Sequence, residues 1–264
     1  MEKHFEDIDQ ENYTPIIEED SIVREMWGEA DTVLFIFGGC AAEFALNKAV
    51  DWLYFTGKLP NNPIGRLFST IKYSHAIMSA DPVEGNLALE NIVNIHRNLQ
   101  KNRKMNIPNW AFKDVLYMLI YYSIVSYEAL ERKVTDQEKE EVFEVFYRIG
   151  TGLLIKDLPK SYGEWEIDYQ KHLDEDLKKS ELTDDLLKQY KRNIGVFRYF
   201  ILVEIQKLLV NEKVRSLLNL KRFSLVSVIL PFYKFSRLIK LDGFIRNFLL
   251  PKEFKEQVKK LDII

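Results

Sequence analysis

The sequence predicts an all-α fold, and three observations support this prediction. Apolar residues recur at the three- and four-residue spacing of amphipathic helices along most of the chain. Glycine and proline number only 11 and 8 in 264 residues, and they fall between the periodic segments. No segment alternates apolar and polar residues as a half-buried strand does. We therefore expect a single helical domain over 19–264, preceded by an acidic tail over 1–18.

Caps and breakers set the helix boundaries expected in the first half of the chain. Asp81-Pro82 combines a residue that caps helix N-termini with the proline favoured in the first turn. The segment 57–63 is rich in turn residues and is predicted to be a loop. The expected helices cover 19–28, 32–54, 64–80, 81–101 and 108–132, and the second is expected to be loosened at Gly38-Gly39.

The second half of the chain is interrupted in the same way. Thr135 and Glu138 match the capping-box pattern, which predicts a helix from there to about 150–152. Further helices are expected at 161–179 and at 183–212, the latter capped by Thr183. The remainder, 214–262, is predicted to form three short helices broken at Pro231, Gly243 and Pro251.

Charged residues are distributed unevenly, although the formal net charge is only -3. Residues 2–31 are acidic, whereas 213–252 contain nine lysines and arginines against the single acid Asp242. A nucleic-acid-binding domain would have a basic excess over its whole length, so no nucleic-acid partner is expected. The basic, apolar C-terminal region could contact an anionic membrane surface. Alternatively, it forms an ordinary solvated rim over a core helix.

Several classes of site are excluded by residues that the sequence lacks. Cys40 is the only cysteine, so neither an internal disulfide nor a CxxC motif exists. No Walker-type phosphate loop, GxGxxG, HExxH or GxSxG motif is present. Di-iron bundles need a glutamate three residues before a histidine, but the residues found there are Lys72, Val93 and Tyr169.

The composition is that of a folded protein, with 47% hydrophobic and 29% charged residues. Met1 is followed by a charged stretch without an apolar signal region. No uncharged apolar run reaches the roughly 20 residues that a membrane-spanning helix needs. We expect a cytoplasmic protein, with peripheral membrane attachment as the alternative.

His96 is the histidine whose surroundings suit a ligand. Ile92, Val93 and Leu99 are its neighbours at i-4, i-3 and i+3, so it projects from an apolar stripe. A histidine in that position is either a metal ligand or a core residue whose hydrogen bonds are satisfied. His172 lies in a charged segment and is expected at the surface.

The preceding helix has a mixed polar face formed by Arg66, Ser69, Thr70, Tyr73 and Ile77, which share one stripe. An arginine and a threonine one turn apart on an inward face need partners for their hydrogen bonds. A haem propionate, bound oxygen or a polar substrate would provide these partners. Alternatively, Arg66 pairs with a carboxylate and Thr70 bonds its own helix backbone.

Several short motifs follow one another with characteristic spacing. Asn62-Pro-Ile-Gly-Arg66 and Leu67-Phe-Ser-Thr70 form a Pro-x-Gly-Arg-x-x-x-Thr signature, and Ile95-His96 follows one helix later. Further motifs are Leu130…Thr135-x-x-Glu138, Gly152, Leu158-Pro159 and Trp165…Tyr169. In their order and spacing, over roughly 27–180, these motifs resemble the rubber oxygenase (latex-clearing protein) and MpaB-type oxygenase family.

The resemblance implies an all-helical, globin-like core that holds haem b. His96 would be the axial iron ligand, with Arg66 and Thr70 beside the distal pocket and Tyr73 on the same cofactor-binding face. The implied activity is oxygenation of an apolar organic substrate by dioxygen. The alternative is a non-enzymatic binding protein of the same fold that holds a lipid or a partner.

The sequence departs from the family at two places. Rubber oxygenase has a lysine, able to cap the iron, just before the threonine, whereas this chain has Ser69, so no sixth ligand is expected. The upstream His-Pro element is replaced by Gly39-Cys-Ala-Ala-Glu43-Phe-Ala. Glu43 is the candidate base there, and the expected catalytic residues are Arg66, Thr70 and Glu43.

Overall fold

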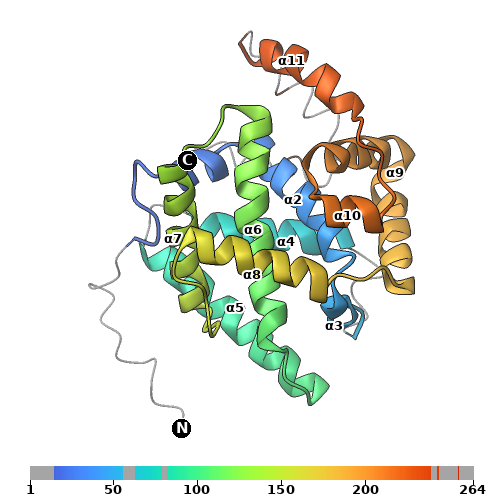
Figure 1. Ribbon diagram of the computed structural model, residues 1–264. Coiled ribbons are helices and arrows are strands. Elements are labelled where there is room, and N and C mark those ends of the chain that lie inside the picture. The colour runs from blue at the N-terminus through green and yellow to red at the C-terminus, as the bar shows by residue number, and fades with distance from the viewer. Residues whose placement is uncertain (1–14, 56–62, 79–81, 239–242, 244–254, 256–264) are drawn as a thin grey trace.

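The computed structural model describes residues 15–55, 63–78 and 82–238, and the single residues 243 and 255. In these ranges helices are the only named elements, apart from one isolated bridge between Asn47 and Leu177. The all-α prediction is therefore confirmed (Figure 1). The helices are α1 (Ile22–Gly28), α2 (Ala30–Phe44), η2 (Lys48–Val50), α3 (Asp51–Phe55), α4 (Pro63–Ile77), α5 (Pro82–Arg103), α6 (Asn109–Leu130), α7 (Asp136–Gly152), α8 (Tyr162–Glu175), α9 (Glu181–Leu209), α10 (Glu212–Leu217) and α11 (Leu225–Leu238).

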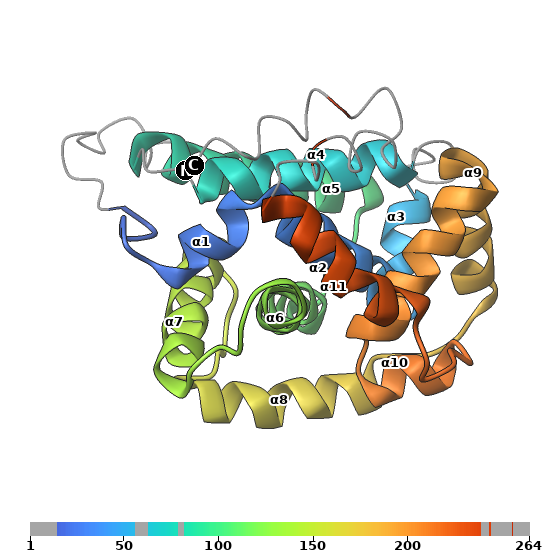
Figure 2. The same ribbon diagram turned by 90° about the horizontal axis from the view of Figure 1, so that it is seen from above.

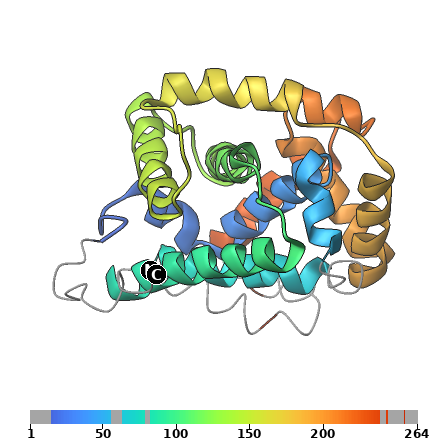
Figure 3. The ribbon, with the colours of Figure 1, turned by 90° about the horizontal axis from the view of Figure 1, so that it is seen from below.

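Helix α6 lies at the centre of the fold, and α2 packs along it. Figures 2 and 3 look nearly along α6 and show the other helices arranged around it. Helices α1 and α7 lie on one side, and α9 with α10 on the opposite side. Helix α8 and the paired helices α4 and α5 close the two remaining sides.

Large aromatic side chains fill the core around α6. Tyr117, Tyr122 and Tyr127 of this helix are almost completely buried, and so is Trp27 of α1. The Trp27 indole donates to the Ser123 hydroxyl at 3.1 Å. The buried aromatic rings thus contribute apolar area while their polar atoms find partners, as burial requires.

Helix α2 approaches α6 closely at Gly39. A Cβ atom at this position would lie only 2.2 Å from Cδ1 of Tyr122. The helix is regular through Gly38 and Gly39, so the expected loosening there is not found. The glycine is needed for close packing of the tyrosine ring rather than for flexibility.

The chain leaves α2 at Phe44, whereas the periodicity predicted one helix over 32–54. The next residues instead bond to the segment that follows α8, where the Lys178 N–H donates to the Leu46 carbonyl at 2.7 Å. Such a long-range backbone contact ends the helix, and local periodicity gives no sign of it.

Other boundaries are partly corrected and partly confirmed. Ile16 and Ile17 are buried in the main core, so the predicted tail over 1–18 extends too far. The N-cap of α9 is Ser180, and Thr183 is its reciprocal partner one turn later. Helix α11 continues through Pro231, where a break was expected. The predicted break at 251 and the cap at 81 lie outside the described residues.

The capping box predicted at the start of α7 is confirmed. The Thr135 hydroxyl accepts from the Glu138 N–H at 3.3 Å, and the Glu138 carboxylate accepts from the Thr135 N–H at 2.8 Å.

Within the described ranges, no helix is both long and apolar enough to cross a membrane.

Candidate functional site

A completely buried carboxyl group, that of Glu43, lies near the C-terminal end of α2. Three side chains from other helices donate to its Oε2 atom. The Tyr122 hydroxyl of α6 lies at 3.0 Å, the Tyr169 hydroxyl of α8 at 2.9 Å and the amide Nδ2 of Asn211 at 3.0 Å. Asn211 also donates to the Tyr169 oxygen at 3.1 Å. We refer to these four residues as the Glu43 cluster.

The second oxygen of this carboxyl, Oε1, is buried and has no hydrogen-bond partner among the described residues. Burial raises the pKa of Glu43 from its usual 4.5 to about 7, and the bonds from Tyr169, Tyr122 and Asn211 oppose this rise. Because Oε2 already accepts three hydrogen bonds, a bound proton belongs on Oε1. Glu43 can therefore take up or release a proton near neutral pH without losing its three contacts.

Aromatic rings enclose the cluster. Tyr169 stacks on Trp165 with ring centroids 5.4 Å apart, and Tyr121 meets the rings of both Tyr122 and Tyr169 at 5.0 and 5.4 Å. Burial is the main cause that raises the pKa of the Tyr122 and Tyr169 hydroxyls well above the usual value. Both phenols thus remain neutral donors to Glu43 at physiological pH.

A second buried acid, Asp114, lies two turns before Tyr122 on α6. Neither of its carboxyl oxygens has a hydrogen-bond partner among the described residues. Burial raises its pKa well above the usual value, and the charges of Glu43 and Asp176 raise it further. The protonated acid is therefore the form that this position favours.

His172 is buried on α8, which corrects the prediction that it lies at the surface. Its Nδ1 atom lies 2.8 Å from Oδ2 of Asp176, one turn later on the same helix. Its ring packs edge-on against Tyr117 with centroids 5.3 Å apart. The polar residues around it in the sequence occupy the outer face of α8, whereas His172 faces α6.

The residues predicted to hold haem lie on α4 and α5. His96 is half-buried on α5, and its ring meets Phe112 of α6 edge-on with centroids 5.0 Å apart. Tyr73 of α4 is half-buried and Thr70 is exposed. Arg66 is part of α4, but its side chain lies outside what the structure describes.

The hydrogen-bond partners of Glu43 come from α6, α8 and the residue that caps α10. Helices α4 and α5 lie on the opposite side of α6 from α8 (Figures 2 and 3). That Glu43 shares a pocket with Arg66, Thr70 and His96 stays a prediction.

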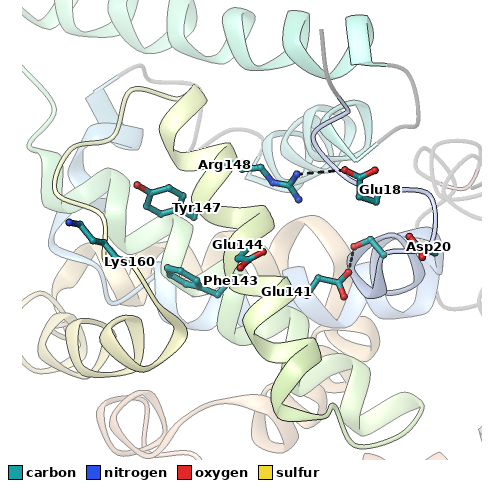
Figure 4. A pocket seen from close by; sticks show the side chains of 9 residues that line it. Glu18, Asp20, Glu141, Phe143, Glu144, Tyr147, Arg148 and Lys160 are labelled. Atoms are coloured by element: carbon teal, nitrogen blue, oxygen red, sulfur yellow. Dashed lines mark hydrogen bonds and ion pairs between the residues drawn. The ribbon is translucent and has the colours of Figure 1, made fainter.

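A cleft of about 640 Å³ opens between α7 and the segment that leads into α1. Figure 4 shows its predominantly acidic lining, in which Arg148 approaches Glu18 at 4.0 Å and Ser21 donates to Glu141 at 2.6 Å. None of the predicted site residues lines this cleft.

Comparison with protein-family models, with curated proteins and with solved structures finds no match. The oxygenase resemblance therefore rests on the sequence motifs alone. Among the described residues, no group of three or more histidine, cysteine, aspartate or glutamate side chains is arranged to hold a metal ion. A haem iron would need only one protein ligand, since the porphyrin supplies the other four nitrogens.

The side chains predicted to hold haem b are of the chemical kinds that bind this cofactor. A partly buried imidazole against an aromatic ring can ligate iron, and the hydroxyls of Thr70 and Tyr73 can bond propionate oxygens. The exposed position of Thr70 suits a propionate at the mouth of such a site better than a place beside bound oxygen. A haem b site on α4 and α5 stays a prediction, in which Thr70 would lie at the mouth of the site.

Proposed function

We propose that this chain is a haem b-dependent oxygenase with a globin-like core that acts on an apolar organic substrate, with His96 as the axial ligand. The observation that supports this proposal most strongly is the packing of α4 against α5. These two helices contain the sequence motif around Arg66 and the histidine that follows it.

The two helices are joined by only 78–81 and pack extensively, so we treat them as an antiparallel pair. Arg66 lies about three turns before the end of α4, and His96 about four turns after the start of α5. The two residues are thus about one turn apart along the pair. That proximity is what a shared cofactor would require.

Each residue would have a distinct task in holding the cofactor. The His96 imidazole would donate its lone pair to the iron, and Phe112 would fix the orientation of the ring. Thr70 and Tyr73 would bond the propionates, together with the Arg66 guanidinium. When bound, the haem would supply the dioxygen chemistry, and apolar residues such as Ile92 would exclude water.

Haem binding is tested by the absorption spectrum of the full-length protein after reconstitution with haemin. We expect a Soret band that saturates at one haem per chain, and a shifted or strongly reduced band in His96→Ala. Arg97→Ala, which removes an exposed neighbour on the same helix, is the matched control and should bind as the unaltered protein does. Added imidazole should restore the axial ligand in His96→Ala. A folded protein without a Soret band, or a band unchanged by His96→Ala, would refute the proposal.

The second candidate is a non-enzymatic helical protein that binds a lipid or a partner. The closed geometry of the Glu43 cluster favours it, because three donors to one oxygen are the arrangement expected of a structural buried acid. This candidate predicts a folded protein that takes up no haem, and a His96→Ala variant that differs only in stability.

A further inference from the structure

Helix α11 is attached to the rest of the protein through polar contacts. The Tyr233 hydroxyl donates to Asp31 of α2 at 2.7 Å, and Arg237 pairs with Glu131 and with Glu29. At the start of the helix, the Leu225 N–H donates to the Glu204 carboxylate of α9 at 2.7 Å. The side of α11 that faces the protein thus buries Leu230 and otherwise presents polar and charged groups.

The opposite side of α11 is apolar and exposed. Five large side chains recur there at i, i+3, i+4, i+7 and i+10, which is the spacing of one helix face. We call them the outer stripe, and their exposed fractions are 44% for Leu225, 53% for Val228, 60% for Ile229, 74% for Phe232 and 62% for Phe235.

This arrangement reverses the usual order of an amphipathic helix, which buries its apolar face against the core. Single exposed hydrophobic residues are common, but a continuous stripe along about three turns normally marks a binding surface. Figure 2 looks down on α11, and no other described helix lies over it. The stripe is continued by Phe223, which precedes the helix and is 62% exposed.

Charge indicates what the stripe contacts. The segment 213–238 contains six lysines and arginines, and four of them pair with acids outside it. Lys213 pairs with Asp174, Arg215 and Arg222 with Glu212, and Arg237 with Glu131 and Glu29. Among the described residues, no acid pairs with Lys221 or Lys234, which leaves these two cations available to a partner. Lys221 and Arg222 are exposed immediately before the stripe, and Lys234 lies beside it. Cations that border exposed phenylalanine and aliphatic side chains are the pattern of helices that lie in the interface of an anionic membrane.

We infer that α11 docks on an anionic lipid bilayer, lying parallel to the surface with the outer stripe inserted at the level of the acyl chains. The lysines and arginines around the stripe then meet lipid phosphates and carboxylates. Arg237, which the sequence placed in the basic region, is not part of this surface because it pairs with acids on the inner side. The inference does not depend on whether the chain binds haem.

The test is co-sedimentation of the full chain with vesicles of phosphatidylcholine alone or with one third phosphatidylserine. We expect binding to the anionic vesicles that weakens at high salt. Each of Phe232→Ser and Phe235→Ser should weaken binding about ten-fold. A phenylalanine at a bilayer interface buries roughly half of its apolar surface, and the serine variant loses the binding free energy of that burial. Lys221→Glu with Arg222→Glu should remove the preference for anionic vesicles. Ile167→Ser, which alters an equally exposed residue of α8, should bind normally.

Depth of insertion gives an independent measurement. The only native cysteine, Cys40, is buried, so an environment-sensitive dye can be placed at Ile229→Cys and, as a control, at Ile167→Cys. The first dye should shift to the blue when anionic vesicles are added and the second should not. Equal binding of the phenylalanine variants, or no blue shift at 229, would overturn the inference. A dimer in solution that Phe232→Ser dissociates would assign the stripe to a second copy of the chain, and would also overturn it.

Discussion

Replacing Glu43 by glutamine should change how the stability of the protein depends on pH. Glutamine has nearly the same shape and can still accept hydrogen bonds from Tyr122, Tyr169 and Asn211, but it cannot ionise. The pKa of Glu43 is about 7 in the folded protein, against an ordinary 4.5. The folded state therefore binds more protons than the unfolded state between these two values.

The sign and the size of the effect on the free energy of unfolding follow from this difference in pKa. Stability contributed by the protonated carboxyl is fully present below pH 4.5 and is lost as the pH rises through about 7. A difference of this size corresponds to about 3 kcal/mol in the free energy of unfolding. Glu43→Gln cannot ionise at this position, so it does not lose this stability as the pH rises. The amide group at the position of Oε1 has no partner, so the variant should be less stable than the unaltered protein at pH 5.

The assay is urea denaturation at several pH values from 5 to 8.5. We expect the stability difference between the unaltered protein and Glu43→Gln to change by about 3 kcal/mol over this range, in favour of the variant at high pH. Glu144→Gln, at an exposed position of α7, controls for the loss of a negative charge. Parallel stability curves for the unaltered protein and Glu43→Gln would refute the raised pKa and the role assigned to Oε1.

Two further changes test the packing and the capping of the fold. Gly39→Ala should destabilise the protein by about 2 kcal/mol, because the added Cβ would overlap the Tyr122 ring, whereas Gly163→Ala, with open space around it, should have little effect or stabilise slightly. Thermal denaturation measures both, and equal melting temperatures for the two variants would contradict the close approach of α2 and α6. Thr135→Ala should cost about 1 kcal/mol by removing the hydroxyl that caps α7, and Thr135→Ser should retain most of that stability. If serine were as destabilising as alanine, the hydrogen bond would not be the cause.

Local patterns in the sequence predicted the helices well where caps and breakers act within a few residues. The capping box at Thr135 and the helices that contain Arg66 and His96 are examples. The end of α2 could not be predicted in this way, since it depends on backbone bonds to the segment after α8. Local periodicity contains no information about such a distant partner.

The Glu43 cluster shows the same limit for the site. Glu43 itself was a predicted candidate base, named where the chain departs from the oxygenase family. Its partners Tyr122, Tyr169 and Asn211 are 79, 126 and 168 residues away in the sequence. Nothing in their local surroundings connects them to a carboxyl group. His172 was predicted at the surface because its sequence neighbours are charged. Those neighbours occupy the outer face of α8, whereas His172 lies on the inner face.

The outer stripe of α11 is a different case, because its spacing is visible in the sequence but its direction is not. Periodicity separates an apolar face from a polar one, and the usual assumption then places the apolar face inside. Here Tyr233 and Arg237 make specific polar contacts with the acids Asp31, Glu29 and Glu131, and these contacts fix the helix with its apolar side outward. The direction could only be found from the tertiary structure.

The Glu43 cluster, the predicted haem residues and the outer stripe of α11 can be tested separately, because their side chains come from different positions and largely from different helices. The Glu43 cluster faces α8, the predicted haem residues lie on α4 and α5, and α11 is held to α2 and α9 through side chains that belong to neither site. If haem binds at His96, saturation with haemin should leave unchanged the part of the pH dependence that Glu43→Gln removes. A change in that part on haem binding would mean that Glu43 responds to the cofactor across α6, and would return Glu43 to the role of a base in the haem site.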